Sequence, residues 1–494
     1  MSLRRAVLAA SLFWACRHQA SPEATLRIAH EADISTLDPA DASDHISISV
    51  LSNIYEALVD LDGDMQLRPG LAVSWGTPEP NTWVFNLRQG VRAHDGQFLA
   101  ADDVRVSLER ARTAPSSSLR TLLSTIASVE SEGPAVVRIR TREPDPMLAV
   151  RLVSVYILPR SAVADAAEKP VGTGPYRFVR RASGLVEVEA FADHWRGPPA
   201  VARAVFVPVA PGPETLGALE RDGVDVLRWV PEELVERVSS LPGVRIEQHA
   251  SLRALYLWMS SGRGTHATPF ADARVRRALS LAIDRDALAA RIGAGNIPLW
   301  GFVPRLAYGH APGHRLPLDP TLARRLLADS GHADGIDAPL VHARGGEHIA
   351  AAVSEMLAPS GIRARPEGMD WPAMRDRWHA GQLPLFIGSW RFEAIEASLF
   401  LRDCVHTRDP AADKSWNPGF SSPRLDAMIE ENFRLFDDEA RRAHFDTLWA
   451  AMAEEMPIVP LVERLDVYAV RSRVRWTPRG DGNLRVAEMT ISAP

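Results

Sequence analysis

The side chains best suited to chemistry in this 494-residue chain do not form a catalytic pattern. The sequence contains no HExxH zinc motif, no GxSxG nucleophile elbow and no phosphate-binding loop. Gly293-Ala-Gly295 begins like a dinucleotide-binding fingerprint, but Pro298 occupies the position of the third glycine. We therefore predict a protein that is not an enzyme and that needs no cofactor.

Clusters of potential metal ligands have simpler explanations. His342 and His348 flank Glu347, but the chain has 15 histidines, so such proximity is expected by chance. Asp102-Asp103 lies where a helix is predicted to begin, and acidic residues at that position cap the free amides of the first turn. No CxxC pair is present either. We predict no metal site.

The first 24 residues have the pattern of an export signal. Arg4 and Arg5 precede the apolar run Ala6–Ala15, which is too short to span a bilayer. Cys16 follows at once, so we expect residues 1–15 to be a signal peptide, Cys16 to be lipidated and residues 16–24 to be a tether. The residues just before Ala15 are bulkier than usual in lipoprotein signals, so a plain cleaved signal is the alternative.

Composition excludes several classes of protein. Apolar residues make up 46% and charged residues 24%, the ordinary globular balance. The formal net charge is −6, which leaves no basic field for a nucleic-acid partner. A single core stops growing at about 250–300 residues, so the chain must fold as several domains.

Alternating and helical apolar patterns are interleaved along the chain. Strands are predicted at 25–30, 83–88, 136–140, 201–209 and 254–259. Helices are predicted at 46–58, 274–288, 319–330, 347–358, 424–434 and 437–455. The charged residues Arg274, Arg276, Asp284 and Arg285 are expected to form ion pairs on one of these helices. The mixture predicts a multi-domain α/β fold.

Several separated stretches carry a likeness to a known family. They are Ser35–Pro39 with Asn53–Leu58, Leu67–Trp75 with Trp83–Arg88, His94–Gly96 with Asp102–Val104, Gly172–Phe178 with Asp193–Trp195, Pro269–Leu279 with Ala282–Arg285, and Ala323–Leu327 with Ser422–Ile429 and Met456–Pro460. In this order and spacing, the chain resembles the extracellular solute-binding proteins of bacterial ABC importers, in the oligopeptide, dipeptide and nickel class.

This resemblance implies a bilobed fold like that of type II periplasmic binding proteins, with an additional domain and a ligand cleft between the lobes. The implied division is discontinuous. Lobe I comprises residues 25–50, 172–262 and 463–494, the additional domain comprises 51–171, and lobe II comprises 263–462. The lobes are expected to close on the ligand by hinge motion.

The resemblance also implies a place for the ligand. In peptide-binding relatives, a Gly-Trp element is followed by an acid that pairs with the ammonium group of the ligand. Gly388-Ser389-Trp390 corresponds to that element, with one inserted serine, and Glu393 corresponds to the acid. Trp390 is expected to form a flat apolar wall beside it. Glu396 is the alternative acid.

Oligopeptide-binding relatives also hold the ligand's carboxylate with arginines in this region. Counted back from Trp390, the corresponding positions hold Trp378 and Ile387. The nearby arginines that could substitute are Arg375, Arg377 and Arg391. Because of this departure from the family pattern, the sequence fixes neither the length of a peptide ligand nor whether the ligand is a peptide.

Four further residues are weaker candidates. Trp371 and Trp378 lie at helical spacing and either line the site or pack in the core. Asp44 and His45 lie where relatives contact the ligand near the N-terminal lip. Some relatives have a disulfide beside the site, but Cys404 would have no partner once Cys16 is lipidated.

The resemblance implies a receptor that captures a small solute, foremost a short peptide, and delivers it to a membrane permease complex. The alternative is a sensing or chaperone-like protein that uses the same cleft and signals to a different partner. We expect an exported monomer in the periplasm or cell envelope that contacts the membrane only through its lipid anchor.

Overall fold

The computed structural model describes residues 25–262, 268–293, 295–392, 395–407, 416–417 and 419–492. The predicted signal peptide, Cys16, the tether and Glu393 lie outside the described residues. Within these ranges, none of the helices combines the length and the apolar character that crossing a bilayer requires.

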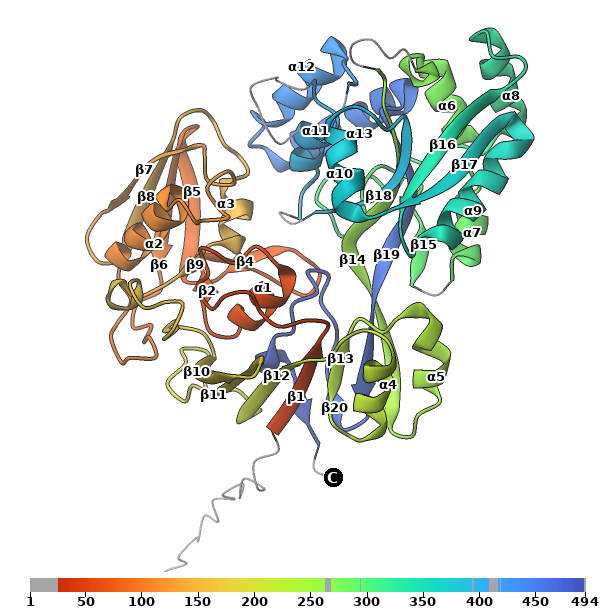
Figure 1. The fold of residues 1–494 in the computed structure, drawn as a ribbon. Coiled ribbons are helices and arrows are strands. Elements are labelled where there is room, and N and C mark those ends of the chain that lie inside the picture. The colour runs from red at the N-terminus through yellow and green to blue at the C-terminus, as the bar shows by residue number, and fades with distance from the viewer. Residues whose placement is uncertain are drawn as a thin grey trace, which may run out of the picture.

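The lower body in Figure 1 is called lobe I here. Its strands are β1 (Thr25–His30), β10 (Tyr176–Ala182), β11 (Leu185–Ala190), β12 (Arg203–Pro208), β13 (Val226–Arg228), β20 (Val474–Arg475) and β21 (Thr490–Ile491). Its helices are α1 (His45–Leu51), α4 (Pro213–Glu220) and α5 (Val235–Ser239). The alternating sequence of β1 places Leu26 and Ile28 in the core. β1 pairs in parallel with both β12 and β13.

The body on the left of Figure 1 is the additional domain. Its strands are β2 (Glu56–Ala57), β3 (Val59–Leu61), β4 (Leu67–Pro69), β5 (Ala72–Glu79), β6 (Thr82–Leu87), β7 (Ile126–Ser131), β8 (Val136–Thr141) and β9 (Tyr156–Ile157). Its helices are α2 (Ala101–Thr113) and α3 (Leu148–Arg151). Four of the strands form a sheet of order β5-β6-β8-β7. This domain has its own hydrophobic cluster, which includes Phe85, Val104 and Ile139.

The upper right body in Figure 1 is called lobe II. Its strands are β15 (Asn296–Pro298), β16 (Ile336–Ala343), β17 (Ile362–Met369) and β18 (Leu385–Arg391). Its helices are α6 (Ala273–Leu281), α7 (Arg285–Arg291), α8 (Pro320–Asp329), α9 (Glu347–Leu357), α10 (Trp371–His379), α11 (Ala397–Cys404), α12 (Pro423–Asn432) and α13 (Asp438–Glu455). Parallel pairing of β16 with β17 and β18 gives this lobe an α/β character.

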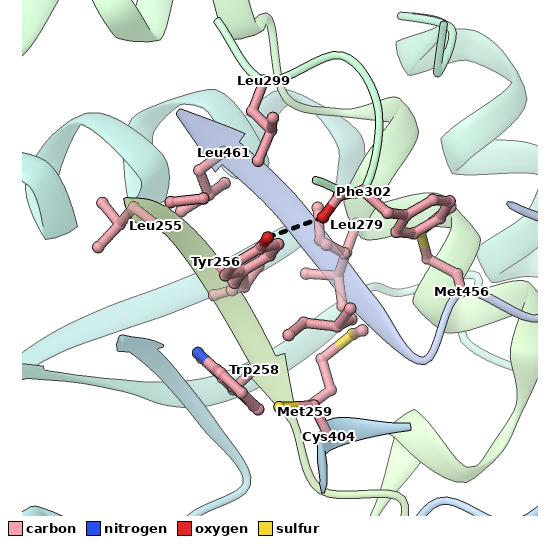
Figure 2. Close-up of a cluster of buried hydrophobic side chains, with 14 of the residues drawn as sticks. Leu255, Tyr256, Trp258, Met259, Leu279, Leu299, Phe302, Cys404, Met456 and Leu461 are labelled. Carbon is pink, nitrogen blue, oxygen red and sulfur yellow. Dashed lines mark hydrogen bonds between the residues drawn. The ribbon is translucent and has the colours of Figure 1, made fainter. Parts of the chain in front are cut away.

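The core of lobe II is assembled around the buried second half of strand β14 (Val244–Met259). Figure 2 shows Tyr256, Trp258 and Met259 of this strand among leucine and methionine side chains. The hydroxyl of Tyr256 donates a hydrogen bond of 2.7 Å to the carbonyl oxygen of Phe302, drawn as a dashed line in Figure 2. The buried phenol is therefore satisfied within an otherwise apolar cluster.

Two long strands connect the lobes: β14 and β19 (Ile458–Arg471). They join the two halves into one eleven-stranded sheet of order β10-β11-β12-β1-β13-β19-β14-β18-β16-β17, with β15 paired to β19. Their pairing is irregular between the lobes, because Ala250 faces Leu465 whereas Ala254 faces Glu463. Three residues of β14 therefore face one residue of β19, and such a bulge bends a strand pair locally.

Several helices begin where a polar side chain caps the first turn. The side chains of Asp272, Asp284, Asp319, Ser422 and Asp437 each accept a hydrogen bond from a main-chain amide two or three residues later. Two predicted helices differ from the structure. The helix predicted at 274–288 is split into α6 and α7 because Asp284 starts a new helix. The helix predicted at 46–58 ends at Leu51, and short strand β2 follows.

The prediction of ion pairs among Arg274, Arg276, Asp284 and Arg285 holds only for Arg274, which pairs with Asp272 at 2.5 Å. Asp284 caps helix α7. Arg276 and Arg285 are buried and donate to main-chain carbonyls instead. The guanidinium of Arg285 reaches the carbonyl of Pro460 at 2.9 Å and that of Ser280 at 3.3 Å. Burial lowers the pKa of Arg285 to about 9. Arg285 therefore ties helix α7 to the start of β19.

Replacing Arg285 with Met should lower the stability of lobe II by about 3 kcal/mol, since several buried carbonyls would lose their donor. For a cooperative unit of ~150–250 residues, this corresponds to a Tm about 6–12 °C lower in differential scanning calorimetry. The control is Arg325→Met, because Arg325 is exposed and forms only a surface ion pair. Equal Tm values for the two variants would contradict the role given to Arg285.

Candidate solute-binding cleft

The carboxyl ends of parallel strands from both lobes carry polar or charged residues. In lobe I, β1 ends at His30 and β13 ends at Arg228. In lobe II, His342 is the penultimate residue of β16, and β18 ends at Arg391. Ligands of open α/β sheets bind beyond the carboxyl ends of the strands, so this edge is where a site is expected.

A cavity of about 290 Å³ lies at this edge and is lined by all three bodies of the molecule. Lobe I contributes His45, Asp481, Asn483 and Arg485 among its polar residues. The additional domain contributes Asp60, Ser118, Ser154 and Tyr156. Lobe II contributes Arg391. The volume is at the lower end of the range for small-molecule pockets, about 300–1,000 Å³.

The rest of the cavity wall is apolar. It includes Leu119, Leu122 and Val153 of the additional domain and Phe392 and Leu399 of lobe II. Apolar walls with a few charged groups suit a solute that is held by its polar ends while its side chains vary.

His45 is a cavity residue with a neutral ring. Its Nε2 lies 3.2 Å from the carbonyl oxygen of Gly482. Burial lowers the pKa of His45 well below its usual value, and the charges of Arg228 and Arg391 lower it further. His45 therefore offers a neutral hydrogen-bonding group to a ligand at physiological pH.

Asp44 does not line the cavity and caps helix α1. Its carboxylate accepts a hydrogen bond of 2.8 Å from the amide of Ser47, and further bonds from the hydroxyls of Ser35 and Ser47. Burial alone would raise the pKa of Asp44, but these hydrogen bonds lower it. Asp44 thus fixes the start of α1, from which His45 projects.

Arg391 lines the cavity from lobe II. Among the residues that the structure describes, no acidic side chain lies within ion-pair distance of its guanidinium. The amide of the next residue, Phe392, donates a hydrogen bond of 2.7 Å to the carbonyl of Leu252, which lies in the bulge of β14. Of the three arginines that the sequence offered, Arg391 is the one that lines this cavity.

The three tryptophan candidates lie away from the cavity. Trp378 is 1% exposed and packs against Trp258 and Phe386 in the core of lobe II. Trp371 is 43% exposed and stacks on Trp416. Trp390 is partly buried and packs on the same core. The structure therefore brings together His45 and Arg391, but not these tryptophans.

Glu396, the alternative acid, is committed elsewhere. It is 1% exposed and pairs with Arg441 at 2.7 Å inside lobe II. Burial raises the pKa of Glu396, although Arg441 opposes this effect. The Glu396 carboxylate is therefore not accessible to a ligand.

Several cavity residues carry no sequence pattern that could have identified them. Asp60 and Arg485 are 425 positions apart in the chain but form an ion pair at 2.8 Å in the cavity wall. Burial alone would raise the pKa of Asp60, but Arg485 and Arg68 lower it. Only the return of the C-terminal segment to lobe I places Arg485 and Asp481 in the wall.

In the described ranges, no group of three or more His, Cys, Asp or Glu side chains is arranged to hold a metal ion. The described Cys404 is buried and free.

A family model described as "Bacterial extracellular solute-binding proteins, family 5 Middle" matches residues 66–411. The chain belongs to this family. It is a solute-binding receptor of an ABC importer, from a family that acts outside the cytoplasm. The expected fold class and the resemblance noted from the sequence are confirmed.

Similar proteins are named as binding proteins. The glutathione-binding protein GsiB of Salmonella typhi is 27% identical over 464 residues, which cover 88% of each chain. The unliganded open form of the periplasmic murein tripeptide-binding protein MppA has a TM-score of 0.82 at 20% identity, covering 95% of this chain and 98% of the other. DppA of Helicobacter pylori, solved with the peptide STSA, has a TM-score of 0.74 at 22% identity, covering 95% and 98%.

Stability should depend on pH through His30, the last residue of β1. This ring stacks on Phe206 at 5.8 Å, and both of its nitrogens are buried without a hydrogen-bond partner. Burial lowers the pKa of His30 to about 3, from 6.5 when unfolded. Between these values the unfolded chain binds more protons, so stability rises with pH up to about 6.5 and is lost on acidification.

His30→Phe should therefore reduce the fall in Tm between about pH 7 and about pH 5, because the variant keeps the stacking but has no proton to bind. Thermal unfolding at the two pH values gives the measurement. The exposed His348 supplies the control, and His348→Gln should keep the wild-type slope. An unchanged slope in His30→Phe would show that His30 does not carry the effect.

Proposed function

We propose that this receptor captures a short peptide or peptide-like solute between lobe I and lobe II, and that the lobes close around it. The observation that carries the proposal is the cavity itself, which takes residues from all three bodies and lies beside the strands that join the lobes. A solute bound there would touch both lobes and favour the closed form.

The relatives narrow the class of solute. One relative is named as a glutathione-binding protein, and one structural neighbour is named as a murein tripeptide-binding protein. A second structural neighbour was solved with a bound peptide. The cavity of this chain suits a molecule of that kind, since apolar walls surround a few polar groups. Glutathione and short peptides are therefore the first solutes to test.

Within the site, we assign ligand contact to His45 and Arg391 and a supporting role to Asp44. Glu393 is proposed to pair with an ammonium group of the solute, and Trp390 to support the segment that carries it. Trp378 and Trp371 are assigned to packing, because one is buried and the other lies on the surface of lobe II away from the cavity.

The division into lobes is part of the proposal. Residues 51–171 form the additional domain. Residues from Leu252 to Met259 of β14 belong to the core of lobe II. We therefore place the first lobe boundary at the bulge of β14 rather than after residue 262, and the second near residue 463 of β19.

The remaining assignments follow from the N-terminal sequence. We propose that Cys16 carries the lipid that holds a monomeric receptor at the membrane, with residues 17–24 as a tether. A sensing role with the same cleft is the alternative. Loss of solute uptake when the gene is deleted would favour import, whereas normal uptake with a lost response to the solute would favour sensing.

Native mass spectrometry of the mature protein, purified from a peptide-rich medium, tests the class of solute. We expect bound masses that differ by amino-acid residues, or the mass of glutathione. A single bound mass that is no peptide would contradict the peptide assignment. If the protein emerges empty, titration calorimetry with glutathione and trialanine replaces the co-purified ligand, and absence of binding to both would also contradict it.

Glu393→Gln should lower the affinity for an amine-bearing solute about 10-fold or more, because a hydrogen bond between two charged groups is replaced by one with a neutral acceptor. The Tm of the empty protein should stay within about 1 °C of wild type, as expected for a site residue that does not hold the fold. Glu367→Gln, at an exposed position of β17, is the matched control. Unchanged affinity in Glu393→Gln would remove Glu393 from the site.

A further inference from the structure

A second cavity, of about 320 Å³, lies between lobe I and the additional domain and takes no residue from lobe II. Asp60, Val153, Tyr156 and Arg485 line both this cavity and the solute cavity, so they form the wall between the two. The volume is within the range for small-molecule pockets, about 300–1,000 Å³. Capture of a solute between lobe I and lobe II makes no use of this space.

Three arginines line the second cavity around one acid. Arg68 lies on β4, Arg196 follows β11, and Arg485 belongs to the C-terminal segment. Asp60 of β3 is directly opposite Arg68 in the strand pairing. Its carboxylate accepts a hydrogen bond of 2.7 Å from Nη2 of Arg68 and one of 2.8 Å from Nη1 of Arg485. One carboxylate thus serves three guanidinium groups.

Arg196 is held by an aromatic ring rather than by an acid. Its Cζ lies 4.5 Å from the centre of the Trp195 ring, a cation–π distance. The Nε1 of Trp195 lies 3.0 Å from each carboxylate oxygen of Glu56, which fixes the ring. Its Nη2 is 3.5 Å from Oδ2 of Asp60, which is too long for a good hydrogen bond. Over the described residues, no group accepts a hydrogen bond from the Arg196 guanidinium, so its donors are available to a ligand.

The other two acids of the cavity wall are engaged elsewhere. Glu488 lies 2.8 Å from Nη1 of Arg479 but 4.0 Å from Arg485. Glu56 accepts a hydrogen bond of 2.9 Å from the hydroxyl of Thr173, in addition to those from the indole. Of the positive charges around Asp60, two are therefore left without a close carboxylate.

These charges repel one another in a partly buried site. Burial lowers the pKa of Arg196, Asp60 raises it, and Arg68 lowers it again. Arginine stays protonated in proteins, so the repulsion persists in the empty cavity. The Nε of Arg485 is in addition buried without a hydrogen-bond partner. A bound oxyanion would supply both the missing negative charge and the missing acceptors.

Much of the remaining wall is apolar. Val153, Pro175, Pro198, Pro199 and Ala200 contribute to it. Each proline has a fixed φ, so this part of the wall is stiff. A bare phosphate ion would fill only a small part of about 320 Å³, which leaves room for an apolar body beside the charged group.

We propose that the second cavity binds a small organic phosphate, whose phosphoryl group is held by Arg68, Arg196 and Arg485 and whose apolar body lies against the prolines. A phosphate monoester carries a charge of about −1.5 to −2 at pH 7, which matches the two uncompensated positive charges. Guanidinium groups donate pairs of parallel hydrogen bonds to phosphate oxygens. The site is separate from the solute cavity, so the inference goes beyond the proposed function.

Titration calorimetry with phenyl phosphate tests the class of ligand, at about pH 7.5, where the phosphate is mostly doubly charged. Phenyl phosphate should bind at least about 10-fold more tightly than benzenesulfonate, which has the same ring but a single negative charge. It should also bind at least about 10-fold more tightly than inorganic phosphate, which has no apolar body. Sodium chloride keeps the ionic strength equal in all three titrations.

Arg196→Met should lower the affinity for phenyl phosphate at least about 10-fold, because a charged donor is lost. The Tm of the empty variant should stay within about 2 °C of wild type, since no hydrogen bond of the protein is removed. Arg424→Met is the matched control, because Arg424 forms an exposed ion pair with Glu454 in lobe II, and it should keep the wild-type affinity. Arg391→Ala, in the solute cavity, should keep it as well.

Four results would overturn the inference. Phenyl phosphate could fail to bind the wild-type protein, or bind Arg196→Met as tightly as wild type. Equal affinities for phenyl phosphate and benzenesulfonate would contradict recognition of a doubly charged group, and equal affinities for phenyl phosphate and inorganic phosphate would contradict an organic ligand. Loss of binding in Arg391→Ala would place the phosphate in the solute cavity and contradict a separate site. None of these results bears on the peptide assignment, which the mass spectrometry tests independently.

Discussion

The pairing of β14 with β19 is the constraint on which the rest of the molecule depends. These strands run through both lobes, and their backbone hydrogen bonds unite the two halves of the sheet. Between the lobes the register slips, and three residues of β14 face one of β19. A continuous ladder would hold the lobes rigidly, whereas a bulge leaves main-chain groups that can change their angle at low cost. The fold is thus stiff within each lobe and weakest between them, beside the cavity.

Charge is concentrated at the same place. His30, Arg228 and Asp466 are buried near the junction and Arg253 is partly buried, and each has a polar atom without a hydrogen-bond partner. Unsatisfied buried polar groups are costly, so a cluster of them calls for an explanation in function. None of these four residues is part of the cavity wall, so the cluster lies near the cleft rather than in its lining.

Much of the fold could be predicted from the sequence, because it depends on local patterns. The alternation in Thr25–His30 gave a strand, and the helical spacing around 347–358 and 437–455 gave α9 and α13. Export was inferred from the charged and apolar pattern of the N-terminus, and the family from motifs that fix turns and caps. The candidate binding site was harder to predict than the fold. His45 and Arg391 were found through their places beside motifs, but Trp378 was placed in doubt and lies in the core, since helical spacing does not distinguish a core face from a ligand wall. Asp60 and Arg485 could not be found, because their positions in the cavity wall depend on contacts between residues hundreds of positions apart.

The central claim is that a solute joins the two lobes across the cleft by bending the β14–β19 connection. Small-angle X-ray scattering tests it most directly, on protein stripped of ligand and on the same sample after addition of the solute identified by mass spectrometry. The account predicts a smaller radius of gyration with bound solute, and a single closed form at saturation. An unchanged radius of gyration in a sample that native mass spectrometry shows to be fully loaded would contradict the hinge, and with it the account of how this receptor holds its solute.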